Sequence, residues 1–143
     1  SEDMLAHLVA FDTTSRESNL PLIEFVETYL GGLGVPSLRV DYEGGRKTNL
    51  YATIGPDVAG GIVLSGHTDV VPVDGQDWSS DPFRLTERDG KLFARGACDM
   101  KGFIAVALAM VPEFLARKLK TPIHLARVAC GQRRGASSRS CSR

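Results

Sequence analysis

The sequence has few cysteines, and none of them is spaced for a redox or metal motif. Cys98, Cys130 and Cys141 form no C-x-x-C pair, and three is not an even set for a disulfide framework. These absences argue against a small secreted protein held together by disulfides. They favour a reducing compartment, and we expect the protein to be cytoplasmic.

The sequence also lacks a long run of apolar residues. The longest run, Phe103 to Pro112, is about half of the ~20 residues that a membrane span needs, so we expect no membrane-spanning segment. No secretory signal is visible, and the true N-terminus stays open because the chain does not begin with Met. With 143 residues, 43% of them hydrophobic, the sequence can bury one core but not two independent ones.

Acidic residues are missing from the last part of the sequence. All 17 lie in residues 1–126, beside 12 of the 17 Lys and Arg, whereas residues 127–143 contain five Arg and no acid. The formal net charge of zero is therefore the sum of −5 and +5. We expect residues 127–143 to be a basic tail, disordered or read out of frame, because the Arg/Ser/Gly/Cys/Ala composition is typical of a GC-rich gene read in the wrong frame. The alternative, a basic arm that binds nucleic acid, is disfavoured because no aromatic residue is interleaved.

Helices and strands alternate along residues 1–126. Apolar spacing predicts a helix over Met4–Phe11, a second one capped by Ser18, and a third over 100–119 that Pro112 kinks. Extended segments are predicted at 38–42, 49–54, 61–65 and 121–126, and Asp89-Gly90 predicts a hairpin turn. The continuous apolar run of 61–65 predicts a central strand buried on both faces. The alternation favours an α/β layer architecture with ligands at the carboxyl ends of strands.

Two short segments carry residues suited to metal chemistry. His67 and Asp69 lie two apart in an extended stretch and point the same way, so Asp69 can orient a His67 that binds a metal. The alternative is a polar turn with one stray histidine. Asp99 precedes the third helix and could bridge two cations, or could simply cap that helix. Lys101 is expected to be a solvated surface charge, since the P-loop spacing is absent.

The sequence around these residues resembles a known family. Ser65-Gly66-His67-Thr68-Asp69-Val70-Val71-Pro72, followed about thirty residues later by Arg95-Gly96-Ala97-Cys98-Asp99-Met100-Lys101-Gly102, is similar to the M20 family of zinc-dependent amidohydrolases and peptidases. Within it, the segments 74–78, 81–83 and 98–103 are most similar to the acetylornithine deacetylase branch. The resemblance covers residues 4–126. Desuccinylases and small-peptide hydrolases of the same family are the alternatives.

The resemblance implies a site, a cofactor and a fold. His67 would bind one Zn²⁺, Asp99 would bridge two, Asp69 would be an active-site partner of His67, and the Asp99–Met100 peptide bond would be cis. Cobalt is an alternative metal. Residues 1–126 would be the N-terminal part of a dizinc catalytic domain, a truncated mixed sheet flanked by helices. The substrate would be a small N-acyl amino acid, with no nucleic acid or membrane as partner, and full-length relatives would be homodimers.

The sequence departs from the family after residue 126. The family continues there with a Glu-Glu pair, a general base and a metal ligand, whereas this chain has no carboxylate after Glu113 and carries Arg133-Arg134 instead. The later ligands and the dimerisation domain of the family are also absent. His124 is expected to be structural rather than a substitute ligand. We therefore expect a chain that is inactive by itself, and a non-enzymatic fragment is the alternative of another class.

Overall fold

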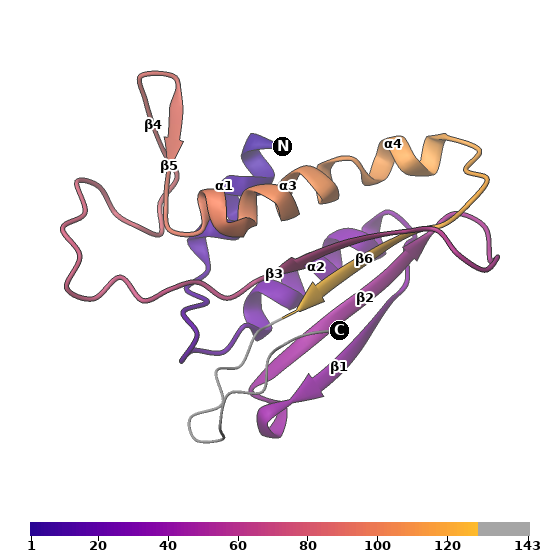
Figure 1. Ribbon diagram of the computed structural model, residues 1–143, viewed down its shortest axis with the longest axis horizontal. Coiled ribbons are helices and arrows are strands. Elements are labelled where there is room, and N and C mark those ends of the chain that lie inside the picture. Colours follow the sequence, from indigo (N-terminus) through magenta and orange to yellow (C-terminus); the bar gives the residue numbers. More distant parts are fainter. Residues whose placement is uncertain (129–143) are drawn as a thin grey trace.

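A computed structural model describes residues 1–128, which form one mixed sheet with helices packed against it (Figure 1). The sheet has the strand order β1-β2-β6-β3. β2 runs antiparallel to both β1 and β6, whereas β3 runs parallel to β6. The strands are β1 (Ser37–Tyr42), β2 (Lys47–Ile54), β3 (Ile62–His67) and β6 (Ile123–Val128), and a short turn η1 (Glu43–Gly45) joins the first two. The predicted α/β class with a mixed sheet is confirmed.

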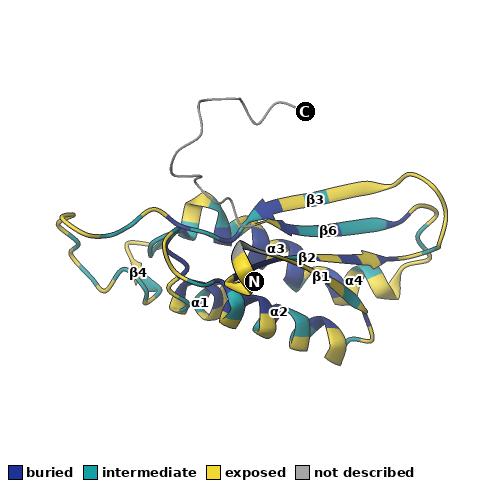
Figure 2. Ribbon diagram, turned by 90° about the horizontal axis from the view of Figure 1, so that it is seen from below, coloured by how far each residue is buried: buried dark blue, intermediate teal, exposed yellow. Residues whose placement is uncertain are grey.

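The helices of residues 1–128 lie on one side of this sheet, as Figure 2 shows. They are α1 (Glu2–Ala10), α2 (Leu20–Gly32), α3 (Gly102–Ala109) and α4 (Val111–Ala116). Pro112 is at the second position of α4, where a missing backbone N–H breaks no hydrogen bond within the helix. The single helix predicted over 100–119 is thus two helices that meet at Met110, and the predicted interruption by Pro112 is confirmed.

The core lies between these helices and the sheet. α2 contributes one apolar face at helical spacing, and β2 contributes every second residue; the buried side chains include Leu22, Ile23, Val26, Leu30, Leu50, Ala52, Ile54 and Leu125. The alternate residues point to the other face of the sheet. On that face Leu38 is 62% exposed and Val40 is 53% exposed. Within residues 1–128, the sheet therefore has one face packed against the helices and one face that exposes apolar side chains to solvent.

The strand expected to be central is an edge strand. β3 pairs with β6 on one side only within the described sheet, and Ile62 is 62% exposed while Val63 is 55% exposed. The prediction that this run is buried on both faces is therefore wrong. β6, which comes last in the described chain, takes the place beside β2 instead.

A second, two-stranded sheet projects from the rest of the molecule (Figure 1). It consists of β4 (Thr86–Arg88) and β5 (Lys91–Phe93), and both turn residues, Asp89 and Gly90, have positive φ. Positive φ at both central positions is the geometry that favours Asp-Gly in tight hairpins. The predicted hairpin is confirmed.

The predicted boundary after residue 126 falls inside a strand. Arg127 and Val128 are the last two residues of β6, and the rest of the predicted tail, with Cys130, Cys141 and the two adjacent arginines, lies outside the described residues. The division of the chain into two parts stays a prediction. In the described part of the chain, no helix has the length and apolar character that crossing a membrane requires.

Candidate metal site

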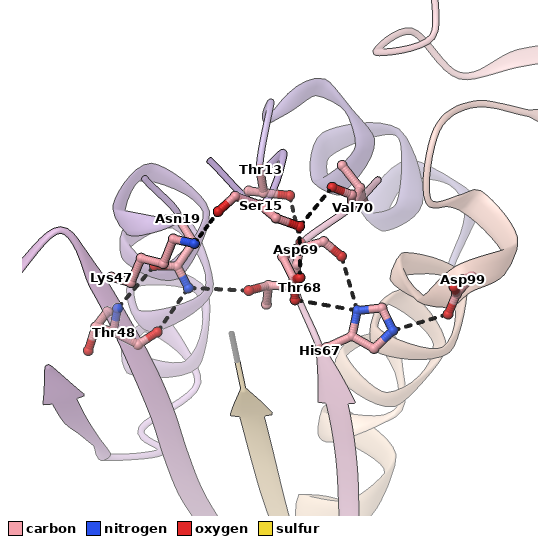
Figure 3. Close-up of polar contacts among 10 residues, drawn as sticks. All are labelled: Thr13, Ser15, Asn19, Lys47, Thr48, His67, Thr68, Asp69, Val70 and Asp99. Carbon is pink, nitrogen blue, oxygen red and sulfur yellow. Dashed lines mark hydrogen bonds and ion pairs between the residues drawn. The ribbon is translucent and has the colours of Figure 1, made fainter. Parts of the chain in front are cut away.

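The three residues singled out in the sequence meet at the carboxyl end of β3 (Figure 3). His67 is the last residue of that strand, Asp69 follows two positions later, and Asp99 comes from the distorted turn η2 (Ala97–Lys101) that leads into α3. His67 Nε2 is 3.1 Å from Asp99 Oδ1. His67 Nδ1 is 3.0 Å from the main-chain oxygen of Asp69 and 3.6 Å from its Oδ1. One ring nitrogen of His67 therefore faces Asp69 and the other faces Asp99.

Both ring nitrogens of His67 face oxygen atoms, Nδ1 those of Asp69 and Nε2 that of Asp99. Nδ1 faces only oxygens of Asp69, so in the tautomer with the proton on Nδ1 the ring donates to the main-chain carbonyl. In the neutral ring Nε2 then has a lone pair directed at a carboxylate oxygen of Asp99, and two lone pairs at 3.1 Å repel each other. A cation between the two atoms would replace this repulsion with two attractive contacts. Side chains that are 34% and 82% exposed leave room for an ion to enter.

The donor set fits a zinc or cobalt ion, but only in part. Imidazole nitrogen and carboxylate oxygen bind zinc at about 2.0–2.2 Å, so two donors 3.1 Å apart can share one ion. A structural or catalytic zinc has about four donors. Among residues 1–128, no group of three or more His, Cys, Asp and Glu could hold a metal ion. Within residues 1–128, His67 and Asp99 therefore offer two donors, fewer than the four that one zinc ion needs.

Two glycines allow the tight turn that presents Asp99. Gly96 has a φ of +77°, and a Cβ there would lie 2.6 Å from Val70 Cγ1. A Cβ on Gly102 would lie 2.4 Å from the main-chain oxygen of Ala97. Neither position accepts a side chain, which is the physical reason for the two glycines around Cys98-Asp99. The Asp99–Met100 peptide bond is cis, as the family resemblance implied.

Lys101 is buried, so the prediction of a solvated surface charge is wrong. None of its surface is exposed, and its Nζ donates a hydrogen bond of 2.8 Å to the main-chain oxygen of Phe11. Burial lowers the pKa of this ammonium to about 8, against the opposing attraction of the Asp12 carboxylate. The side chain ties the end of α1 to the turn that carries Asp99.

A buried polar network behind the site was not anticipated from the sequence. The Asn19 side chain donates to Thr48 O at 2.9 Å and to Thr68 Oγ1 at 3.2 Å, and it accepts from Thr48 N at 3.0 Å. Thr13 Oγ1 donates to Thr68 O at 2.6 Å. These bonds fix Thr68, which lies between His67 and Asp69. The turn-forming residues of the 12–19 segment were the only signal in the sequence.

The site opens into a pocket of about 340 Å³. Ser15, Arg95 and Cys98 line it together with the three site residues, beside Val70, Val71, Ala94 and Gly96. The Arg95 guanidinium lies 4.9 Å above the Trp78 ring and donates to Gln76 Oε1. A positive charge thus borders a pocket that already contains two carboxylates.

His124 lies on β6, where it makes contacts of a structural kind. Its Nδ1 is 3.0 Å from Thr53 Oγ1, its Nε2 is 3.2 Å from Gly60 O, and its ring stacks on Tyr51. Both nitrogens are therefore engaged, in agreement with the structural role expected for this residue.

The sequence has relatives among known enzymes. Residues 63–130 match the model of "Peptidase family M20/M25/M40". The chain is 40% identical over 129 residues to acetylornithine deacetylase of Pasteurella multocida (strain Pm70), a match that covers 85% of this chain and 34% of the relative. It is 45% identical over 124 residues to acetylornithine deacetylase of Myxococcus xanthus, covering 83% of this chain and 32% of the relative. The chain spans about a third of the length of these curated relatives.

Solved structures agree with the fold. Human carnosine dipeptidase 1 superposes with a TM-score of 0.75 at 30% identity, over 87% of this chain and 30% of that one. An M20 family metallo-carboxypeptidase from Sulfolobus solfataricus superposes with a TM-score of 0.73 at 25% identity, over 86% of this chain and 29% of that one. The predicted zinc-peptidase-like fold is confirmed, and the described chain corresponds to part of it.

Proposed function

We propose that this chain, which belongs to peptidase family M20/M25/M40, carries part of the dizinc centre of a hydrolase that cleaves N-acyl amides. The observation that supports the proposal most is the pairing of His67 Nε2 with Asp99 Oδ1 at 3.1 Å. It brings two donor atoms together at the carboxyl end of β3, within the segment that matches the family.

Each site residue has a separate role in this proposal. His67 would bind one zinc through Nε2, and Asp99, whose carboxylate has two oxygens, would bind the same ion and could supply its second oxygen to another. The main-chain oxygen of Asp69 would accept the Nδ1 proton of His67, with the Asp69 carboxylate 3.6 Å from the same nitrogen, which would favour this tautomer and make Nε2 a better ligand. When bound, the two ions would acidify a water molecule and polarise the amide carbonyl.

For the substrate we propose N-acetylornithine, hydrolysed to ornithine and acetate in arginine biosynthesis. The 40% and 45% identity to two acetylornithine deacetylases supports this choice over a peptide substrate, for which carnosine dipeptidase at 30% identity is the precedent. A succinyl-diaminopimelate desuccinylase or another M20 peptidase is the alternative within the family. A cytoplasmic location and a homodimeric full-length enzyme belong to the same proposal.

The chain by itself supplies only part of this chemistry. Deacylation needs a general base, and no carboxylate follows Glu113 in the sequence. Residues 1–128 offer two donors for ions that need about four each. These two observations favour an inactive chain with weak metal binding. A non-enzymatic fragment with no metal site is the alternative, and metal binding separates the two.

The experiment is a titration of the full chain with Zn²⁺ by calorimetry and with Co²⁺ by absorbance. We expect weak binding that falls at least about tenfold in His67→Gln and in Asp99→Asn. His124→Gln and Asp57→Asn are matched controls, because they remove the same groups away from the pocket, and they should bind within twofold of the parent chain. Equal binding by the parent chain and His67→Gln would contradict the proposal.

A further inference from the structure

The segment before α2 lies directly against the loop that carries Asp69. Val70 N donates to Thr13 O at 3.0 Å, and Ser15 N donates to Val70 O at 3.1 Å. Thr14 and Val70 form an isolated parallel bridge between the two segments. This short pairing places the side chain of Ser15 beside Asp69 at the edge of the pocket (Figure 3).

The two oxygens of the Asp69 carboxylate face different partners. Ser15 Oγ lies 3.2 Å from Oδ2 and donates its proton there, with Val70 O as a more distant acceptor at 3.4 Å. Oδ1 lies 3.6 Å from His67 Nδ1. A carboxylate held through Oδ2 cannot rotate freely about its own axis, so the hydroxyl of Ser15 keeps Oδ1 directed at the histidine ring.

We propose that Ser15 is a positioning residue: it holds the Asp69 carboxylate beside His67 Nδ1, where the negative charge supports the proton that Nδ1 donates to the main-chain oxygen of Asp69, and Nε2 is offered to a metal ion. This inference rests on the proposed metal site. Ser15 does not touch the metal, and it acts through Asp69 and His67 in turn. No sequence pattern points to Ser15, because its partner is 54 residues away along the chain.

The surroundings of Ser15 make it a clean position for substitution. Its backbone is held independently of its hydroxyl, through the bond from its N–H to Val70 O and through Lys47 Nζ, which donates to Ser15 O. Its side chain is half-buried at the pocket edge. Ser15→Ala therefore removes the hydrogen bond to Asp69 while the main chain keeps its contacts.

The test compares Ser15→Ala with Ser15→Thr and with Ser18→Ala in the full chain. Ser18 is the matched control, since its hydroxyl donates to Arg46 O at 2.7 Å and accepts from Leu20 N at 3.2 Å. We expect Ser15→Ala to weaken Zn²⁺ binding by about three- to tenfold, which is below the 10–100-fold typical of a direct partner of a metal ligand. Ser15→Thr, which keeps the hydroxyl, and Ser18→Ala should bind within twofold of the parent chain.

A second readout needs no metal. Long-range ¹H–¹⁵N spectra at pH 8 report which nitrogen of His67 carries the proton, and we expect the Nδ1–H form to dominate in the parent chain and to fall at least twofold relative to Nε2–H in Ser15→Ala. Unchanged proton placement in Ser15→Ala would overturn the role of Ser15, whatever the metal affinity. Failure of the parent chain to bind Zn²⁺, with the proton placement changed by Ser15→Ala, would instead overturn the proposed function alone. Equal losses of Zn²⁺ affinity in Ser15→Ala and Ser18→Ala would show that the role of Ser15 is merely structural.

Discussion

Arg127 is a charged side chain in the middle of the sheet, and replacing it with methionine should stabilise the protein. It lies on β6 between Leu50 of β2 and Gly66 of β3, with none of its surface exposed. Its Nη1 donates one long hydrogen bond of 3.4 Å to Leu64 O. Within the described part of the chain, Nε and Nη2 have no partner.

The size of the effect follows from the cost of burying the charge. Burial lowers the pKa of the Arg127 guanidinium to about 10, which is more than two units below its ordinary value. At about 1.4 kcal/mol for each tenfold change in acidity, this corresponds to about 3 kcal/mol of lost stability. The loss is complete below about pH 10, because there the folded state still carries the charge, and it diminishes as the pH rises towards the unfolded pKa. Methionine has a similar length and no charge, so Arg127→Met should gain about 2–4 kcal/mol at pH 7.

Urea and thermal unfolding at pH 7 measure this gain. We expect the thermal unfolding midpoint of Arg127→Met to rise by roughly 10 °C, and its free energy of unfolding to rise by about 2–4 kcal/mol. Arg84→Met is the control, because Arg84 is exposed, and it should change the free energy by less than about 0.5 kcal/mol. A loss of stability in Arg127→Met with no change in Arg84→Met would show that interactions of the guanidinium outweigh the cost of its burial, and the reasoning would be refuted.

Three further predictions concern other parts of the molecule. Burial lowers the pKa of Lys101 to about 8, so between pH 8 and 10.5 the folded state has lost a proton that the unfolded state still holds, and the urea midpoint of the parent chain should rise over this range. Lys101→Met should lack that rise. A rise of equal size in both proteins would contradict the lowered pKa of Lys101. With Zn²⁺ or Co²⁺, the full chain should hydrolyse N-acetylornithine no faster than the metal alone, and a rate that Asp99→Ala abolishes would disprove this. The sheet face that carries Leu38 and Val40 should bind a hydrophobic dye. The double variant Leu38→Lys/Val40→Lys should reduce the fluorescence of the bound dye at least by about half, with little change in the free energy of unfolding. Undiminished dye fluorescence would show that the dye binds elsewhere.

Local signals predicted the local structure well. Asp89-Gly90 specifies a tight turn through its own backbone preferences, and Pro112 ends a helix through its own ring, so neither depends on distant residues. The position of β3 was different. Its apolar run indicates burial, but which strand lies beside it depends on pairing with residues about 60 positions later, and 55% exposure of Val63 is the outcome in the described structure.

The parts of the site that could be predicted are those indicated by residue type and spacing. His67, Asp69 and Asp99 follow from the two motifs, and the structure brings them together, although their metal-binding role remains a proposal. The environments of Ser15, Asn19 and Lys101 were not predictable, since each depends on a partner between 49 and 90 residues away. A serine or a lysine in a loop has no pattern that reveals such a partner.

The central place of β6 has a consequence for the order in which the molecule assembles. β1 and β2 can pair as soon as both exist, because they are neighbours in sequence, but within the sheet of residues 1–128 β3 joins them through β6. Closing that long loop is entropically costly and comes before the contacts that reward it, so the joining of the two halves is a late event. Thr68 N donates to Val128 O at 2.9 Å, which ties the residue between His67 and Asp69 to the final residue of β6. During refolding, the capacity to hold a metal should therefore be among the last properties that the chain acquires.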